Sequence, residues 1–307
     1  MKNLVRAFKN FCKFWNDFGV LTACGVKIGH KLTGDLQPQH RTIIRYLKRN
    51  YKELIEEYQH KNFTYVEGEI PDDCPIWVCW FQGEEQMPPI VKVCFQHVQK
   101  HRGRHEVRLI TVANLKDWVF VPAHIMTKVR LGEITLTHFS DFVRNALLAE
   151  HGGIWVDATL YLTKDLKGYP YPFYTIKQNK PADHVYVSEY RWTTFFLCGM
   201  KGNPLNSFVR DMLSAYIRKE RTFIDYYLFD YVIAVGYETI PAIRQMIDKV
   251  PYSNPHLHGM QLEQPVDVGR LQEMYKDTSI FKVTYKIAPP EDKRALYYYI
   301  LKNETIH

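Results

Sequence analysis

The stretch HFSDFVRNALLAEHGGIWVDATLYLTKDL, residues 138–166, decides the fold of this chain. Its first half predicts an amphipathic helix, because apolar side chains recur at the spacing of one helix face: Phe139, Phe142, Val143, Ala146, Leu147 and Ala149. Either Ser140 or Asp141 is placed to cap the start of this helix. The helix therefore begins near residue 140 in this interpretation.

A glycine pair ends the helix, and a short apolar run follows it. Gly152 and Gly153 permit the left-handed backbone that commonly closes a helix. The run at 154–156 predicts a buried strand, which delivers Asp157 to the strand's carboxyl end. In open α/β sheets ligands bind at that edge. Asp157 taken alone has another interpretation, as a turn former.

Two charged residues lie on the helix that precedes the glycines. Asp141 and Arg144 are three positions apart, so they share one helix face. A carboxylate and a guanidinium in this arrangement suit a ribose hydroxyl, a base edge or a phosphate. The alternative is a solvated ion pair at the surface, which is common and weak.

The combination of these features is more specific than any one of them. Ser-Asp-x-x-Arg, a helix and Gly-Gly-Ile-Trp-Val-Asp-x-Thr together resemble the nucleotide-sugar site of DXD-type glycosyltransferases. The sequence most resembles the capsular polysaccharide synthesis proteins, and also the related Och1-type mannosyltransferases and glycosylating toxins. The resemblance covers residues 76–166 and weakens toward residue 286. It implies a GT-A-like fold and transfer of a hexose, with retention, from a nucleoside-diphosphate sugar, UDP-sugars being favoured.

The resemblance also implies roles for individual residues. Asp141 and Arg144 would contact the nucleoside and phosphate part of the donor, and Gly153 and Thr159 would complete the donor-binding set. Asp157 would be a catalytic residue, the first carboxylate of the motif and a ligand of Mn²⁺ or Mg²⁺. The usual motif is Asp-x-Asp, whereas this chain has a threonine at the second position. A neutral hydroxyl is a poorer ligand for these ions than a carboxylate, so the requirement for a metal stays open.

A tryptophan-containing segment follows the first predicted strand. In the resembling families this segment touches the nucleotide base, and here Trp80, Gln82 and Gly83 match it. Core packing is the alternative for Trp80, since tryptophan is on average highly buried.

A carboxylate within a very apolar segment is a further candidate for the site. Asp230 lies in the apolar run 225–231, where burial would be costly unless the group is paired. We interpret it as a catalytic residue facing the donor or acceptor sugar. The alternative is that it lies on the wet side of a helix.

The resembling enzymes often use a late histidine or lysine at the diphosphate. This chain offers four candidates, His256, His258, Lys282 and Lys286. The run 281–286 alternates in polarity, which predicts a strand with both lysines on one face.

Strands and helices alternate along the chain in the order of an α/β protein with a Rossmann-type, mostly parallel sheet flanked by helices. The main predicted strands are 76–81, 107–110 and 154–156, followed by short ones at 160–162, 173–176, 185–187 and 194–198. The predicted helices are 88–100, 113–120, 122–130, 204–219, 225 onward, 242–250 and 296–301. Residues 1–70 form an N-terminal helical extension with a helix at 38–59, and residues 71–307 form the glycosyltransferase domain.

Charge and composition narrow the partners. The 307 residues carry a net charge of +7, which suits anionic ligands or surfaces. Nucleic acid is not an expected partner, because the sequence has no zinc finger or RNP motif. The six cysteines show no Cys-x-x-Cys pair, which fits reduced thiols in the cytoplasm.

Residues 1–18 combine basic and aromatic helical stripes. Such a helix lies either on a membrane surface or on its own domain. The resemblance implies that the membrane would be the inner face of the cell membrane, where a lipid-linked acceptor lies.

Three functions remain open on these grounds. The first is a glycosyltransferase that extends a capsular or cell-surface glycan, with a free or lipid-linked glycan as acceptor. The second is a catalytically inactive subunit that binds the nucleotide-sugar, which the missing second aspartate would explain. The third is a capsule sugar-phosphate transferase.

Overall fold

The computed structural model describes residues 11–27, 34–61, 68–181 and 183–302. Within these residues the central sheet has five strands, in the spatial order β2 (Val107–Ile110), β1 (Ile76–Cys79), β3 (Gly153–Val156), β6 (Phe196–Gly199) and β5 (Phe173–Thr175). A smaller sheet pairs β4 (Leu160–Leu162) with β7 (Ile280–Lys282).

The central sheet is mostly parallel, as expected. Strand β1 pairs in parallel with both β2 and β3, β6 is antiparallel to β3, and β5 is antiparallel to β6. Four of the five strands therefore point the same way, and only β6 runs against them. The chain passes from β1 to one neighbour, β2, and then returns across β1 to the other neighbour, β3. This reversal makes the carboxyl ends of β1 and β3 a topological switch point, where α/β proteins bind ligands.

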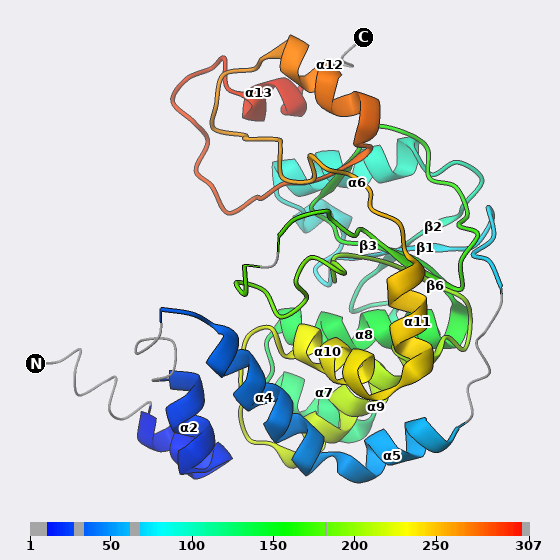
Figure 1. Ribbon diagram of the computed structural model, residues 1–307. Coiled ribbons are helices and arrows are strands. Elements are labelled where there is room, and N and C mark those ends of the chain that lie inside the picture. Colours follow the sequence, from blue (N-terminus) through cyan, green and yellow to red (C-terminus); the bar gives the residue numbers. More distant parts are fainter. Residues whose placement is uncertain (1–10, 28–33, 62–67, 182, 303–307) are drawn as a thin grey trace, which may run out of the picture.

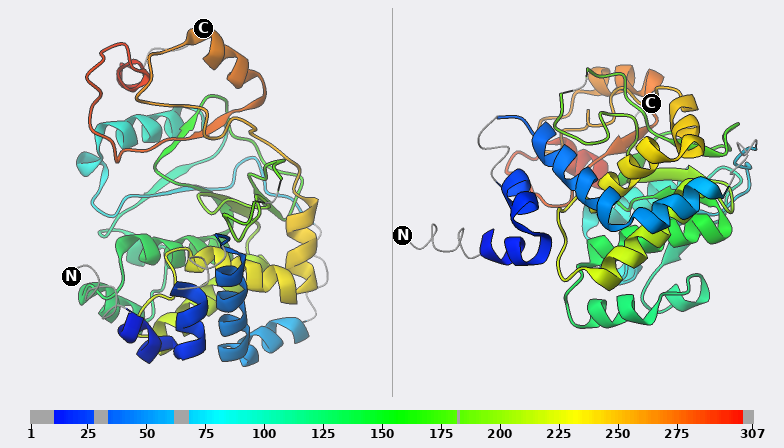
Figure 2. Two further views of the ribbon diagram at one scale, coloured as in Figure 1. Left: turned by 60° about the vertical axis from the view of Figure 1, so that its left-hand side comes forward. Right: turned by 60° about the horizontal axis from the view of Figure 1, so that its bottom comes forward.

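Helices cover both faces of the sheet (Figure 1). On one side lie α7 (Ala123–Arg130), α8 (Leu136–His151), α9 (Pro204–Lys219), α10 (Leu228–Thr239) and α11 (Pro241–Lys249). On the other side lie α6 (Pro89–Lys100), α12 (Val268–Asp277) and α13 (Leu296–Leu301). The turned views in Figure 2 show the same layers. The arrangement confirms the expected α/β class.

A second hydrophobic cluster lies on the α6 side of the molecule. Tyr161 of β4 and Phe281 of β7 are buried there with side chains from α6, α12 and α13. The cluster matters for function because it fixes the end of β7, a late segment of the chain, beside the start of β4.

The N-terminal helices pack on the α8–α10 side. They are α2 (Val20–Lys27), α4 (Gln37–Asn50) and α5 (Lys52–His60), and their apolar residues belong to the main hydrophobic core. The single helix expected at 38–59 is thus two helices. The chain bends at Tyr51, whose buried ring stacks near Tyr216 and whose hydroxyl donates to Glu220 at 2.9 Å. The expected boundary between residues 70 and 71 stays a prediction.

The membrane-facing helix expected at 1–18 lies partly outside the described residues. Residues 11–18 are helical, and Phe14 and Phe18 are buried against their own protein, whereas Trp15 is 46% exposed. The described part therefore docks on its own domain through at least one face. Among the described helices none is long and apolar enough to cross a bilayer.

Helix α8 begins earlier than the capping pattern predicted. Its N-cap is Thr135, whose hydroxyl accepts from the backbone N–H of His138 at 3.2 Å. Ser140 and Asp141 lie inside the helix, where Ser140 donates back to the carbonyl of Thr137. The prediction was wrong because Leu136, Thr137 and His138, which precede the buried stripe, are not buried and so gave no apolar signal.

Other differences concern weakly patterned segments. The expected helix at 113–120 is only a short 3₁₀ turn, η2 (Leu115–Asp117), and a second such turn, η1 (Glu84–Gln86), was not expected. Residues 185–187 form turns rather than a strand, the strand expected at 281–286 ends at Lys282, and α12 was not predicted. These segments follow the tertiary contacts around them rather than a periodic pattern of their own.

The glycine pair after α8 allows the helix to run directly into the sheet. Gly152 caps the helix at φ +71° and Gly153 starts β3 at φ +110°. A Cβ on Gly153 would lie 2.3 Å from the carbonyl oxygen of Pro75 and 2.9 Å from the indole nitrogen of Trp77. Close backbone approach between β3 and β1 is therefore possible only with glycine at this position.

We expect Gly153→Ala to lower the free energy of unfolding by about 3 kcal/mol or more, because it combines left-handed strain with a backbone clash. The matched control is Gly132→Ala. Gly132 also has a positive φ, +70°, but open space around its Cα. Strain alone should cost that variant about 1 kcal/mol. Urea titration measures the free energy of unfolding of both variants. An equal decrease in Gly153→Ala and Gly132→Ala would contradict the proposed backbone clash.

Candidate active site

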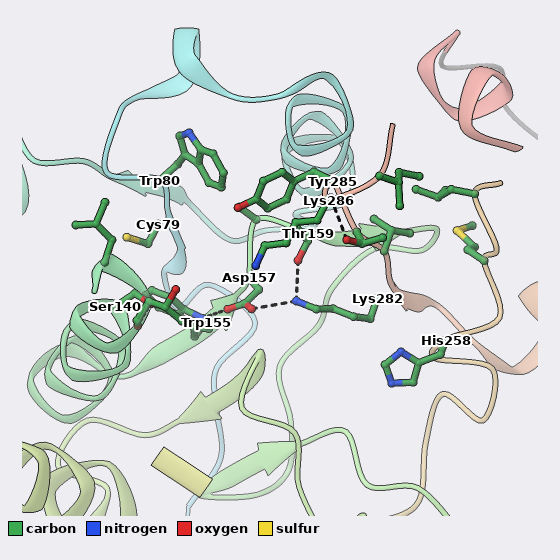
Figure 3. Close-up of a pocket in the computed structure, with 18 of the residues that line it drawn as sticks. Cys79, Trp80, Ser140, Trp155, Asp157, Thr159, His258, Lys282, Tyr285 and Lys286 are labelled. Atoms are coloured by element: carbon green, nitrogen blue, oxygen red, sulfur yellow. Dashed lines mark hydrogen bonds and ion pairs between the residues drawn. The ribbon is translucent and has the colours of Figure 1, made fainter. Parts of the chain in front are cut away.

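A cavity of about 950 Å³ opens at the switch point of the sheet. Its floor comes from the carboxyl ends of β1 and β3, one wall from α8, and the opposite wall from β7 and the residues after it. Side chains from segments far apart in the sequence meet here, as Figure 3 shows. The size is that of a site for a small organic ligand.

Arg144 is the fixed cation of this cavity. Its side chain is only 6% exposed, and the guanidinium lies over the rings of Trp155 and Phe229, at 4.8 and 5.1 Å from their centroids. It donates to the carbonyl of Thr194 at 2.8 Å and to Asp157 Oδ1 at 3.2 Å. These contacts hold one charged group in a single orientation, which suits recognition of an anion.

Asp157 lies at the centre of the charged groups. Its Oδ1 accepts from Arg144 and, at 2.8 Å, from the indole of Trp155, while Oδ2 accepts from Lys282 Nζ at 3.1 Å. Burial alone would raise the pKa of this carboxyl, but Lys282 and Arg144 outweigh burial and hold the pKa below its ordinary value. Asp157 is therefore ionised at neutral pH.

Asp141 lies behind Arg144 and does not line the cavity. Its Oδ1 is 3.4 Å from Arg144 Nη1, and its side chain is 13% exposed. Burial raises the pKa of this carboxyl to about 7, even though Arg144 opposes the shift. The structure thus brings Asp141, Arg144 and Asp157 together as expected, with Asp141 buttressing the arginine. Its expected contact with the donor stays a prediction.

Aromatic residues border the cavity on the side of β1. Trp80 and Tyr285 lie edge to face with ring centroids 5.6 Å apart, and both line the cavity together with Gln82. Gly83 follows in a turn at φ +88° and does not line it. Trp80 is thus not a core residue, and its ring is available to a flat ligand such as a base.

Gly153 and Thr159 have different positions. Gly153 is buried at the start of β3, where it serves the packing described above rather than the cavity lining. Thr159 lines the cavity, and its hydroxyl lies 2.6 Å from Lys282 Nζ. The donor-binding roles expected for both residues stay predictions.

Lys282 was one of four unranked candidates in the sequence. The structure places its ammonium directly on Asp157 and Thr159, while Lys286 and His258 line the same cavity. His256 does not line it and lies 3.8 Å from Asp277 instead. No local pattern could distinguish Lys282, because it reaches the site only through the pairing of β7 with β4.

The residues around Asp157 do not fit a divalent cation. Mg²⁺ and Mn²⁺ prefer several oxygen ligands, mostly carboxylates. Here one carboxylate, already bonded to three donors, faces one hydroxyl, and within the described ranges no three His, Cys, Asp or Glu side chains gather as a metal site. Lys282 and Arg144 would also repel such an ion. Two like unit charges 4 Å apart cost about 4 kcal/mol at an effective dielectric constant of 20.

Asp230 lines a second, smaller cavity of about 320 Å³ rather than the first. It accepts from the indole of Trp192 at 3.0 Å, and burial raises the pKa of its carboxyl to about 6. Tyr190 and Tyr227 are among the aromatic residues of this cavity, and His258 lines both cavities. Two adjoining cavities are what an enzyme with two substrates requires.

The fold and the cavity define the class of protein: it is an α/β protein with a mostly parallel sheet and a cavity at the switch point of that sheet. Cations and aromatic rings line the cavity. The chain belongs to the capsular polysaccharide synthesis protein family, whose sequence pattern matches residues 31–301. It is also 33% identical over 102 residues to the O-glycosyltransferase PaGT of Phomopsis amygdali. That match covers 30% of this chain and 25% of the fungal protein.

Two solved structures are distantly similar. The glycosyltransferase PaToxG aligns with 69% of this chain and 90% of its own at 15% identity, with a TM-score of 0.41. The bacterial N-acetylglucosamine transferase NleB aligns with 73% of this chain and 99% of its own at 11% identity, with a TM-score of 0.33. Both proteins, like PaGT, are glycosyltransferases by name.

The raised pKa of Asp141 predicts a pH dependence of stability. The carboxyl loses its proton near pH 4 when unfolded and near pH 7 when folded, so its contribution is full below pH 4 and is lost as the pH rises to 7. Asp141→Asn has no ionisable group at this position, so it does not lose stability from this source as the pH rises. The stability of the variant relative to wild type should therefore increase by roughly 1 to 3 kcal/mol between pH 5 and pH 8.

Urea titrations at the two pH values measure the difference. Asp117→Asn, at an exposed aspartate of η2, controls for the removal of one negative charge. A difference between wild type and Asp141→Asn that does not vary with pH would show that the Asp141 carboxyl is ionised throughout.

Proposed function

We propose that this chain is a GT-A-like glycosyltransferase. It moves a hexose from a nucleoside-diphosphate sugar to a growing capsular or cell-surface glycan, with retention at the anomeric carbon. Membership of the capsular polysaccharide synthesis protein family supports the biological setting. The observation that carries the proposal is the cavity itself, in which Arg144, Lys282 and Asp157 meet beside the Trp80–Tyr285 pair.

Different parts of the cavity lining suit the base, the diphosphate and the sugar of such a donor. The aromatic pair Trp80 and Tyr285 suits a nucleobase, because aromatic rings stack on the faces of bases. The resemblance described above favours uracil as this base. The cations Arg144, Lys282 and Lys286 suit the diphosphate. Asp157, ionised and held by three donors, is placed to orient a sugar or ribose hydroxyl.

Departure of the diphosphate is the step that these cations assist. Negative charge develops on the leaving phosphate as the glycosidic bond breaks, and fixed cations stabilise it without having to reorganise. Arg144 is fixed by two rings, a carbonyl and two carboxylates, so it meets this requirement. A single such contact is typically worth about 100-fold or more in rate.

The smaller cavity suits the acceptor. Its aromatic rings and the Asp230 carboxyl resemble the lining expected for a sugar ring and its hydroxyls, and His258 borders both cavities. A free or lipid-linked glycan is the proposed acceptor. Contact of residues 1–18 with the inner membrane face would bring the enzyme to a lipid-linked one.

One observation favours a second candidate function. Thr159 stands where the general Asp-x-Asp motif has a second carboxylate, which would suit a subunit that binds the nucleotide-sugar without turning it over. Hydrolysis of the donor in the absence of acceptor separates an active enzyme from such a subunit. Phosphorus in the glycan product would instead identify a sugar-phosphate transferase.

We expect Asp157→Asn to reduce transfer on the order of 100-fold or more while the protein stays folded, because the amide keeps an acceptor for Trp155 but loses the charge that orients the donor. Chromatographic detection of released nucleoside diphosphate measures turnover, with UDP-, GDP-, CDP- and dTDP-sugars selected first by thermal shift. Asp165→Asn, an exposed aspartate, is the control. Unchanged turnover in Asp157→Asn would refute the assignment.

A further inference from the structure

Lys282 is delivered to the cavity by the fold and not by its own flexibility. It is the last residue of β7, opposite Leu160 in the antiparallel β4–β7 pair. Backbone hydrogen bonds on both sides of this position fix it, from Lys282 N to the carbonyl of Leu257 at 2.7 Å and from Val283 N to that of Thr159 at 3.1 Å. The ammonium is therefore a built part of the site.

The ammonium has the contacts that a bound cation would have. It lies 3.1 Å from Asp157 Oδ2, 2.6 Å from Thr159 Oγ1 and 4.8 Å from the centre of the Phe195 ring. Figure 3 shows it pointing between the first and third residues of the Asp157-Ala158-Thr159 motif. This is the place between the two motif side chains where the resemblance implied a metal.

Charge balance explains why threonine and lysine occur together. Two aspartates with a divalent cation sum to zero, and one aspartate with an ammonium also sums to zero. Replacing the second aspartate by Thr159 removes one negative charge, and replacing a divalent ion by Lys282 removes one positive charge. The Thr159 hydroxyl still offers an oxygen to the ammonium, as its 2.6 Å contact shows.

We propose that Lys282 takes the place of the divalent cation in this site, so that the protein binds the diphosphate of its donor without a metal. This inference rests on the proposed function, since it names how the same site holds the same donor. The ammonium binds the diphosphate and stays beside it as the sugar leaves. A lysine does this as a point charge that donates up to three hydrogen bonds.

The test measures binding, separately from turnover. The full-length chain is stripped of metal with EDTA, and calorimetry follows the binding of UDP, GDP, CDP and dTDP with and without Mn²⁺. We expect one of these nucleotides to bind with a Kd that changes less than twofold between EDTA and Mn²⁺. Binding that disappears in EDTA and returns with Mn²⁺ would overturn the inference and leave the proposed function standing.

Absence of binding of all four nucleotides, with and without Mn²⁺, would overturn both the inference and the proposed function. The two failures are thus distinguishable. Because this arm uses the unaltered protein, it stays decisive even if a variant does not fold.

Variants test the lysine itself. Lys282→Met should weaken nucleotide binding at least tenfold without rescue by Mn²⁺, whereas Lys282→Arg should retain most of it. Lys276→Met removes an exposed lysine of α12 that pairs with Glu273, and should leave the Kd unchanged. Equal Kd values for wild type and Lys282→Met would overturn the inference.

A double variant tests whether a metal can again take the place of the Lys282 ammonium. Thr159→Asp with Lys282→Ala restores Asp-x-Asp and removes the ammonium. We expect this variant to bind Mn²⁺, detected by loss of the free-ion EPR signal, and to bind nucleotide at least tenfold more tightly with Mn²⁺ than with EDTA. Mn²⁺ binding by wild type as strong as by the double variant would overturn the inference.

Discussion

The contact between Arg144 and Asp157 is the constraint on which the rest of the site depends. It joins helix α8 to the end of β3 across the glycine pair, and the guanidinium also holds the carbonyl of Thr194 just before β6. A charge so deeply buried is tolerated only when paired, and Arg144 has two carboxylate partners, Asp157 and Asp141, so that loss of one charge leaves it paired with the other. The ion pair therefore fixes the helix, the strand and the cavity floor in one arrangement.

The three aspartates near Arg144, which are Asp141, Asp157 and Asp230, differ in their pKa values. Asp157 faces two cations and remains ionised, while Asp141, behind the arginine, and Asp230, in the adjoining cavity, have raised pKa values of about 7 and about 6. Partial protonation of Asp141 near pH 7 thus leaves the surroundings of Arg144 less negative than the number of carboxyl groups suggests, whereas Asp230 is mostly ionised at that pH. The diphosphate of the proposed donor would meet two cations here, Arg144 and Lys282.

Much of the fold could be predicted because its signals are local. The periodicity of α8, the glycines after it and the apolar run of β3 lie within about twenty residues, and the crossover helices have patterns as clear. Predictions failed where structure depends on distant contacts, at the bend at Tyr51 and in the unpatterned segment that becomes α12. The cap at Thr135 is a local contact, and it was missed because the residues that follow it are exposed.

The sequence alone predicted that Asp141, Arg144 and Asp157 would share one region, because a helix, a tight glycine turn and a short strand follow one another directly. Only the tertiary structure selected Lys282 from four candidates and moved Asp230 to a second cavity. Residues 157 and 282 are joined by the pairing of two three-residue strands and a cluster of apolar side chains around them. Such long-range contacts depend on how the helices and sheets pack together, which the spacing of residues within one segment does not predict.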